Sequence, residues 1–178
     1  MRVPDFGVLR HDRTYVTLYS LAEERPVALV FLRHLGCIFC REQVGTLRDD
    51  LPDANIVFVT MSEPKLADRF RTWLRSPHVF LCDPERRIYE AFGVKRSVAG
   101  KFFSQTVVKR ALRAYRKGYR NALTFDDQLQ LGGAYVFDRD GEVLYSHDAN
   151  DISDYPSSET LRAALALPDP VYDAIGSA

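Results

Sequence analysis

The sequence has few cysteines and no long hydrophobic run. Cys37, Cys40 and Cys82 are the only cysteines in 178 residues, and such an odd, low number excludes a framework of structural disulfides. The first residues lack the apolar stretch of a signal peptide. No run approaches the ~20 apolar residues that a membrane-spanning helix needs. We therefore expect a soluble protein that resides in the cytoplasm and has no membrane partner.

An excess of charge of either sign is also absent. Lys and Arg together number 24, and Asp and Glu together number 24, so the formal net charge is zero. A neutral chain gives no electrostatic reason to expect a nucleic-acid partner. The length of 178 residues predicts a single domain, whereas nothing in the sequence predicts the oligomeric state.

Segments typical of strands and helices alternate along the chain. Continuous runs of apolar, β-branched and aromatic residues predict buried strands, and apolar residues spaced every three or four positions predict helices. The predicted strands are Thr14–Tyr19, Val27–Leu32, Ile56–Val59, Val79–Cys82, Ala134–Phe137 and Val143–His147. The predicted helices are Ile38–Leu51, a segment from Pro64 to Leu74, Arg86–Phe92 and Ser158–Leu167, with another inside residues 98–125.

This alternation predicts an α/β fold with a central mixed sheet sandwiched by helices. We expect most strands to be parallel, with the last two forming an antiparallel hairpin around Asp138–Gly141. Residues 1–167 are assigned to the domain, 98–125 to a helical insertion before the C-terminal hairpin, and 168–178 to a C-terminal tail. Reactive groups in such sheets gather at the carboxyl ends of the strands, and Cys37 follows the first buried strand.

Cys37 and Cys40 form a Cys-x-x-Cys pair at the predicted start of a helix. The free N–H groups and the positive end of the helix dipole favour a thiolate there, which makes Cys37 a candidate nucleophile. Cys40 lies one turn further along the same side of the helix. From this shielded position it could attack a mixed disulfide or a sulfenic acid formed on Cys37. The spacing therefore indicates thiol–disulfide chemistry.

Two other interpretations of this pair stay open. Cys37 and Cys40 could form half of a structural zinc site, although no second pair of ligands follows at a metal-binding spacing. They could also be ordinary buried cysteines. Redox chemistry is favoured because the pair follows a strand and begins a helix within a β-α-β pattern. Cys82 ends a predicted strand and is interpreted as buried and inert.

Three basic residues lie near the pair in the sequence. Arg33, His34 and Arg41 could add positive charge that favours a thiolate, and His34 could also move a proton. Each could equally be an ordinary residue of the surface or of a loop. They are therefore candidate supporting residues of the site.

The segment between Ala91 and Phe125 is basic. It holds nine Lys and Arg residues and no Asp or Glu. An apolar stripe from Val108 to Tyr119 is expected to face inward, opposite a basic face that includes Arg113 and Arg116. An anionic partner could bind this face. We favour a solvated face that is offset by acidic residues elsewhere in the chain.

Several short motifs together resemble one known group of proteins. They are Pro4-Asp5-Phe6, Val27–Leu32, Gly36–Glu42, Asp83-Pro84, Tyr89–Gly93 and Gln130–Phe137. In these motifs the sequence is similar to the peroxiredoxin-like AhpC/TSA antioxidant group of the thioredoxin superfamily, in its peroxiredoxin-like 2 or selenoprotein L-like branch. The resemblance covers residues 3–167. It implies a thioredoxin-like fold in which Cys37 is the nucleophile and Cys40 resolves the intermediate.

The sequence departs from that group at two places. Typical peroxiredoxins carry Pro-x-x-x-Thr-x-x-Cys, whereas Val30 and His34 occupy the Pro and Thr positions here. Thioredoxins place a cis-proline before the strand beside the active cysteines, where this chain has Gly132 and Gly133. The two glycines would let a substrate backbone approach the cysteines, or they simply form a tight turn.

The sequence therefore predicts a thiol-dependent, peroxiredoxin-like oxidoreductase that reduces a peroxide or a disulfide. A thioredoxin- or glutathione-type reductant would reset the pair, and neither a bound cofactor nor a metal is expected. Two alternatives remain. One is a non-catalytic thioredoxin-fold binding module that uses the basic helix 101–120. The other is a small metal-binding domain built on Cys37 and Cys40.

Overall fold

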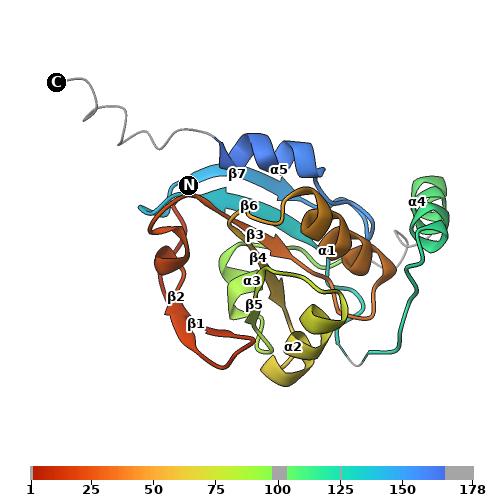
Figure 1. Ribbon diagram of the computed structural model, residues 1–178, viewed down its shortest axis with the longest axis horizontal. Coiled ribbons are helices and arrows are strands. Elements are labelled where there is room, and N and C mark those ends of the chain that lie inside the picture. The colour runs from red at the N-terminus through yellow and green to blue at the C-terminus, as the bar shows by residue number, and fades with distance from the viewer. Residues whose placement is uncertain (1, 98–103, 125, 167–178) are drawn as a thin grey trace.

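The computed structural model describes residues 2–97, 104–124 and 126–166. The predicted tail 168–178 and residues 98–103 and 125 of the predicted insertion lie outside the described residues. The described chain forms a seven-stranded sheet with helices packed on it (Figure 1). None of the helices in these ranges combines the length and the apolar character needed to cross a membrane.

The elements follow the predicted alternation of strands and helices. The strands are β1 (Gly7–Arg10), β2 (Tyr15–Thr17), β3 (Val27–Phe31), β4 (Ile56–Thr60), β5 (Val79–Cys82), β6 (Gly133–Phe137) and β7 (Val143–Asp148). The helices are the 3-10 turn η1 (Tyr19–Ala22) and the α-helices α1 (Ile38–Asp50), α2 (Pro64–Trp73), α3 (Arg87–Ala91), α4 (Gln105–Arg116) and α5 (Ser158–Leu165). The predicted α/β class is confirmed.

The strand order across the sheet is β2-β1-β5-β4-β3-β6-β7. β3 pairs in parallel with β4, and β4 with β5, whereas the other four pairings are antiparallel. The mixed sheet is confirmed, but the expectation of mostly parallel strands is wrong outside the three central ones. β1 has no counterpart among the predicted strands. Only one of its four residues is buried, so it lacks the apolar run that marks a central strand.

The side chains of β3 point alternately to the two faces of the sheet, and each face has its own core cluster. Ala28 and Val30 face a cluster to which α1, α2, α4 and α5 contribute. Leu29 and Phe31 face the opposite cluster, which includes residues of η1 and α3. Every residue of β3 is buried, which explains why its sequence is continuously apolar rather than alternating.

The helix α2 buries only part of its apolar side. Ala67 and Phe70 are buried, but Leu66 and Trp73 are 47% and 60% exposed. Arg41 of α1 contacts the Trp73 ring, and its guanidinium carbon lies 4.9 Å from the ring centroid. A cation–π contact of this kind suits an aromatic ring at the surface.

The helix α4 also turns a different face inward. Val107 and Ala114 are buried, whereas the predicted stripe is exposed at Val108, Leu112 and Tyr115. Arg113 and Lys117 form ion pairs with Glu42 of α1. The expectation that the apolar stripe faces inward is therefore wrong for Val108, Leu112 and Tyr115, whereas Ala111 and Tyr119 of the stripe pack against the core.

Local sequence signals position the last hairpin and the last helix. The hydroxyl of Ser157 accepts the N–H of Thr160 and caps α5. The β6–β7 hairpin turns through Asp138–Gly141, and Gly141 has a φ of +76°, a backbone conformation that favours glycine. The C-terminal hairpin is therefore positioned by its own turn chemistry.

Tyr89 of α3 binds the neighbouring ends of β3 and β4. The end of β3 leads on to the cysteines. The Tyr89 ring is 1% exposed, and its hydroxyl lies 2.5 Å from the Leu32 carbonyl oxygen and 3.0 Å from that of Val59. Leu32 also donates its N–H to Val59. Tyr89 therefore fixes the point where the chain leaves the sheet toward Cys37.

We expect the substitution Tyr89→Phe to lower the free energy of unfolding by about 1–3 kcal/mol, because it removes the hydroxyl donor of the buried Leu32 carbonyl oxygen, whereas the Val59 carbonyl oxygen keeps the N–H of Leu32. Urea denaturation of the purified protein measures this change. The matched control is Tyr15→Phe, since Tyr15 is 76% exposed, and it should change stability by less than about 0.5 kcal/mol. Equal stabilities of the two variants would contradict the role given to Tyr89.

Candidate functional site

Cys37 lies at the N-terminal end of α1, as predicted. It is the N-cap residue, with an extended backbone at φ −75° and ψ 129°, and its N–H donates to the carbonyl of His34. The residue is 3% exposed. The loop 32–36 therefore delivers its sulfur from the carboxyl end of β3 directly onto the start of a helix.

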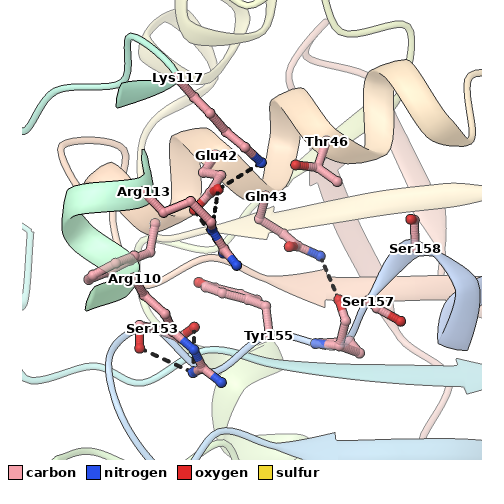
Figure 2. A pocket seen from close by; sticks show the side chains of 12 residues that line it. Glu42, Gln43, Thr46, Arg110, Arg113, Lys117, Ser153, Tyr155, Ser157 and Ser158 are labelled. Carbon is pink, nitrogen blue, oxygen red and sulfur yellow. Dashed lines mark hydrogen bonds and ion pairs between the residues drawn. The ribbon is translucent and has the colours of Figure 1, made fainter. Parts of the chain in front are cut away.

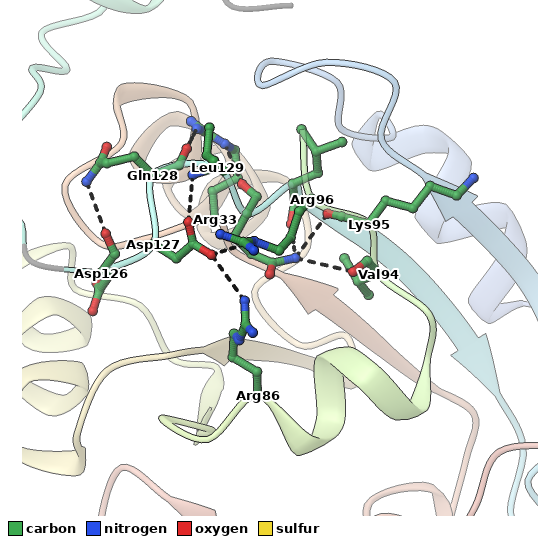
Figure 3. Close-up of polar contacts among 11 residues, drawn as sticks. Arg33, Arg86, Val94, Lys95, Arg96, Asp126, Asp127, Gln128 and Leu129 are labelled. Atoms are coloured by element: carbon green, nitrogen blue, oxygen red, sulfur yellow. Dashed lines mark hydrogen bonds and ion pairs between the residues drawn. The ribbon is translucent and has the colours of Figure 1, made fainter. Parts of the chain in front are cut away.

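Arg33 places a positive charge on this sulfur. Its Nη1 lies 3.2 Å from Cys37 Sγ, and its side chain also donates from Nε to the Gln130 carbonyl and from Nη2 to the Gln128 carbonyl. The residue is 3% exposed, so the interpretation of Arg33 as a surface charge is wrong. Figure 3 shows its side chain beside Asp127, Gln128 and Leu129. The carbonyl groups hold the guanidinium in place.

These surroundings lower the pKa of Cys37 to about 6. The hydrogen bond from Cys40 contributes most, burial opposes it, and Arg33 and the backbone N–H groups of Cys40 and Phe39 lower the pKa further. At neutral pH most of Cys37 is therefore thiolate. The thiolate form is the one that acts as a nucleophile.

Cys40 differs from Cys37 in its position on the helix and in the direction of its pKa shift. It is fully buried one turn inside α1, and its Sγ lies 3.3 Å from the hydroxyl of Tyr155. Burial is the main cause that raises its pKa well above the usual range, and the neighbouring Cys37 adds to it. The two cysteines are not joined by a disulfide here. The site thus combines a thiolate at Cys37 with a protonated thiol at Cys40.

His34 does not supply positive charge to the thiolate, and the charge of Arg41 acts on Cys37 more weakly than that of Arg33. Burial, together with the nearby Arg33, lowers the pKa of His34 to about 4, so its ring is neutral at pH 7. The expectation that His34 adds positive charge is therefore wrong. Arg41 donates to the carbonyl groups of Leu35 and Arg120, and it fastens the loop before Cys37 rather than binding the sulfur.

Gly132 and Gly133 make room for the protein itself. A Cβ atom on Gly132 would lie 2.7 Å from the hydroxyl oxygen of Tyr155, and one on Gly133 would lie 3.0 Å from the His147 carbonyl oxygen. Gly133 pairs with Phe31 in β3. The space in which a substrate backbone was expected beside Gly132 is filled by Tyr155. That expectation is therefore wrong for Gly132.

The segment after α4 lies against the cysteine loop. The side-chain oxygen of Asn121 accepts the N–H of Ile38 at 2.9 Å, and Ala122 donates its N–H to Gly36 at 2.9 Å. A Cβ on Gly36 would overlap the Ala122 carbonyl oxygen. Asn121 and Tyr155 are site residues that sequence reasoning missed, because each is a single polar residue in a loop outside any motif.

An ion-pair cluster around Asp127 holds the later part of this segment in place. The carboxylate of Asp127 accepts Arg86 at 3.1 Å and Arg96 at 2.8 Å (Figure 3). The cluster lies directly before the two carbonyl groups that hold Arg33. It therefore helps to keep the guanidinium beside the sulfur.

Several basic residues of the insertion contact other parts of the protein. Arg113 and Lys117 bind Glu42, and Arg110 binds the carbonyl and hydroxyl of Ser153 (Figure 2). Together with Tyr155 and the start of α5, they line a cavity of about 260 Å³. This pairing supports the favoured interpretation of a basic face offset by acids elsewhere. Lys101 lies outside the described residues.

Among the described residues, neither a reactive Cys82 nor a metal site is supported. Cys82 is 5% exposed, and burial is the main cause that raises its pKa to about 12, so it is a poor nucleophile. Among the residues that the structure describes, no group of three His, Cys, Asp or Glu side chains could hold a metal ion.

Comparison with known proteins adds independent evidence. A family model described as "AhpC/TSA antioxidant enzyme" matches residues 42–151, a range that begins after Cys40. Human "Peroxiredoxin-like 2C" is 27% identical over 175 residues, which covers 90% of this chain and 77% of that protein. The "Prostamide/prostaglandin F synthase" of Salmo salar is 28% identical over 161 residues, with 85% and 80% covered.

The fold is shared with solved peroxiredoxin structures. The crystal structure of peroxidoxin BcpB from Mycobacterium tuberculosis superposes with a TM-score of 0.67 at 18% identity, covering 95% of this chain and 97% of that one. The thioredoxin-like fold and the peroxiredoxin-like resemblance predicted from the sequence are therefore confirmed.

We expect Arg33→Met to raise the pKa of Cys37 by roughly one to two pH units, because loss of a neighbouring cation disfavours the thiolate. The measurement is the rate of Cys37 alkylation by iodoacetamide against pH, followed by mass spectrometry. In the unsubstituted protein this rate should rise with a midpoint near 6 and level off above it.

The control for this experiment is Arg41→Met, which removes a neighbouring arginine that binds carbonyl oxygens rather than the sulfur. It should move the midpoint much less. A midpoint that stays near its original value in Arg33→Met would show that Arg33 does not stabilise the thiolate.

Proposed function

Because the chain belongs to the AhpC/TSA antioxidant enzyme family, we propose that it is a thiol-dependent oxidoreductase that reduces a peroxide through Cys37 and Cys40. The observation that carries this proposal is the contact of 3.2 Å between the Arg33 guanidinium and Cys37 Sγ. The contact holds a cation beside a thiolate at the start of a helix, where it can also stabilise charge on a departing oxygen.

In the first step the Cys37 thiolate attacks one oxygen of a hydroperoxide. The new S–O bond forms as the O–O bond breaks, and the second oxygen leaves with the electron pair and takes a proton from solvent. Cys37 becomes a sulfenic acid, and the peroxide becomes an alcohol or water. Negative charge moves from sulfur to oxygen in this step, within reach of a guanidinium that carbonyl groups already hold in position.

In the second step Cys40 attacks the oxidised sulfur of Cys37. A disulfide forms, and the sulfenic oxygen leaves as water together with the proton of Cys40. The placement of Cys40 one turn deeper on α1, hydrogen-bonded to Cys37, supports this role. Two electrons have then passed from the cysteine pair to the peroxide.

An external thiol must return the pair to its reduced form. We propose a thioredoxin- or glutathione-type reductant, which would exchange its own thiols for the Cys37–Cys40 disulfide. The two motif cysteines are not joined by a disulfide in the structure. The cytoplasmic location predicted from the sequence stays a prediction, and it fits a pair that needs a reducing compartment.

A disulfide is the second candidate substrate. The Cys-x-x-Cys spacing favours it, because the same attack by Cys37 on a sulfur would give a mixed disulfide that Cys40 can resolve. The binding-module alternative receives less support, because Arg110, Arg113 and Lys117 of the basic segment already have partners within the protein. The metal alternative would require ligands besides Cys37 and Cys40.

We expect mild peroxide treatment to oxidise this pair in a defined order. In the unsubstituted protein, mass spectrometry should find a loss of two hydrogens that maps to Cys37 and Cys40. In Cys40→Ser it should find a sulfenic acid on Cys37, either as one added oxygen or as the adduct of a sulfenic-acid reagent. Cys37→Ser should show neither product, because Cys40 is buried and protonated.

The matched control is Cys82→Ser, which should behave like the unsubstituted protein. A Cys37 that stays a free thiol with hydrogen peroxide, with an organic hydroperoxide and with a small disulfide would overturn the proposed function. Oxidation by the disulfide alone would replace the peroxide with the second candidate substrate.

A further inference from the structure

The hydroxyl of Tyr155 is a polar side-chain group that lies against the sulfur of Cys40. Its oxygen lies 3.3 Å from Cys40 Sγ, across 115 positions of sequence. Tyr155 comes from the loop between β7 and α5. Its side chain reaches into the space between that loop and α1, where Figure 2 shows it beside Gln43 and Ser157.

This contact is built into the fold from several sides. Gly132 lacks a side chain where a Cβ would lie 2.7 Å from the Tyr155 hydroxyl. Gln43 of α1 donates to the carbonyl of Pro156 at 3.2 Å, directly after Tyr155. Asp154, directly before it, accepts the N–H of Asn150 at 2.9 Å. The phenol is therefore held against Cys40 from both neighbouring positions of the chain.

The phenol acts here as a hydrogen-bond donor. Burial, together with the neighbouring cysteines, raises the pKa of Tyr155 well above its usual range, so the hydroxyl keeps its proton at neutral pH and is not a base. In the reduced protein the thiol of Cys40 donates to the Cys37 thiolate. The Tyr155 O–H is then left to donate to the Cys40 sulfur.

Oxidation of Cys37 changes the balance at Cys40. Besides burial, the two causes that raise the pKa of Cys40 are its hydrogen bond to Cys37 and the charge of that thiolate. Both disappear once Cys37 carries an oxygen or a mixed disulfide. The hydrogen bond from Tyr155 is then the foremost of the remaining causes that lower the pKa, with the charge of Arg33 behind it.

We propose that Tyr155 is a catalytic residue of the resolving step, in which its hydroxyl donates a hydrogen bond to Cys40 Sγ as that sulfur loses its proton and attacks Cys37. The inference rests on the proposed function and extends it to the second half of the reaction. The Cys40 proton leaves with the departing group, the S–S bond forms, and the phenol ends the step unchanged. Hydrogen bonds to charged groups are about twice as strong as neutral ones, so Tyr155 favours the thiolate of Cys40 over the thiol.

The test uses 2,2′-dithiodipyridine, a small neutral disulfide whose released thiopyridone absorbs light. Cys37 attacks it first, giving a mixed disulfide and one thiopyridone. Cys40 then attacks the mixed disulfide, giving the Cys37–Cys40 disulfide and a second thiopyridone. The cysteine pair loses two electrons and the reagent gains two. Stopped-flow absorbance separates the two phases, and Cys40→Ser identifies the second phase by abolishing it.

We expect Tyr155→Phe to slow the second phase roughly tenfold or more, with the first phase changed less than about twofold. Raising the pH should restore the second phase, because Cys40 then ionises without the phenol. A purely structural effect of the substitution would not show this pH-dependent recovery. Gly132→Ala should slow the same phase, since the added methyl group pushes against the Tyr155 hydroxyl.

The matched control is Tyr145→Phe, which removes the hydroxyl of another partly buried tyrosine packed against the same core cluster. Both phases should stay unchanged in that variant. An unchanged second phase in Tyr155→Phe would overturn this inference while leaving the proposed function in place. A first phase no faster at neutral pH than that of an ordinary exposed thiol would instead overturn the proposed function.

Discussion

The structure of the site depends on one constraint, which is that a buried thiolate needs a fixed positive charge. Cys37 is 3% exposed, so its charge is costly unless a partner compensates it. Arg33 provides that partner, but a buried guanidinium also needs acceptors for its other N–H groups. The carbonyl groups of Gln128 and Gln130 supply them. The thiolate thus requires the segment after α4 to lie against the cysteine loop.

The same helix turn gives two cysteines opposite properties. Helix position, Arg33 and a donated hydrogen bond lower the pKa of Cys37, whereas deeper burial raises that of Cys40. A single hydrogen bond between the sulfurs strengthens both shifts, because it stabilises one sulfur as thiolate and the other as thiol. In the proposed mechanism, the division into attacking and resolving cysteine therefore follows from the pKa difference within the reduced pair, before any substrate arrives.

Local patterns in the sequence predicted the parts of this protein that local physics determines. The apolar run of β3, the start of α1 at Cys37 and the hairpin at Asp138–Gly141 each depend on neighbouring residues, and each is found. The burial of Arg33 and the contact of Tyr155 with Cys40 join segments about a hundred positions apart, which no periodicity records. The phase of α4 was missed for a related reason, since its contact with Glu42 of α1 also joins segments about seventy positions apart.

The lowered pKa of Cys37 also bears on the choice between peroxide and disulfide. Only the reduced pair contains a thiolate, so every interaction that stabilises it favours the reduced form over the disulfide and makes the pair a weaker reductant. The raised pKa of Cys40 does not offset this at neutral pH, because an ordinary cysteine is already a thiol there. A weak reductant transfers electrons poorly to a stable disulfide, but it can still reduce a peroxide, whose O–O bond is a much stronger oxidant. Under the proposed function, the electrostatics that lower the pKa of Cys37 therefore support a peroxide over a stable disulfide as the substrate.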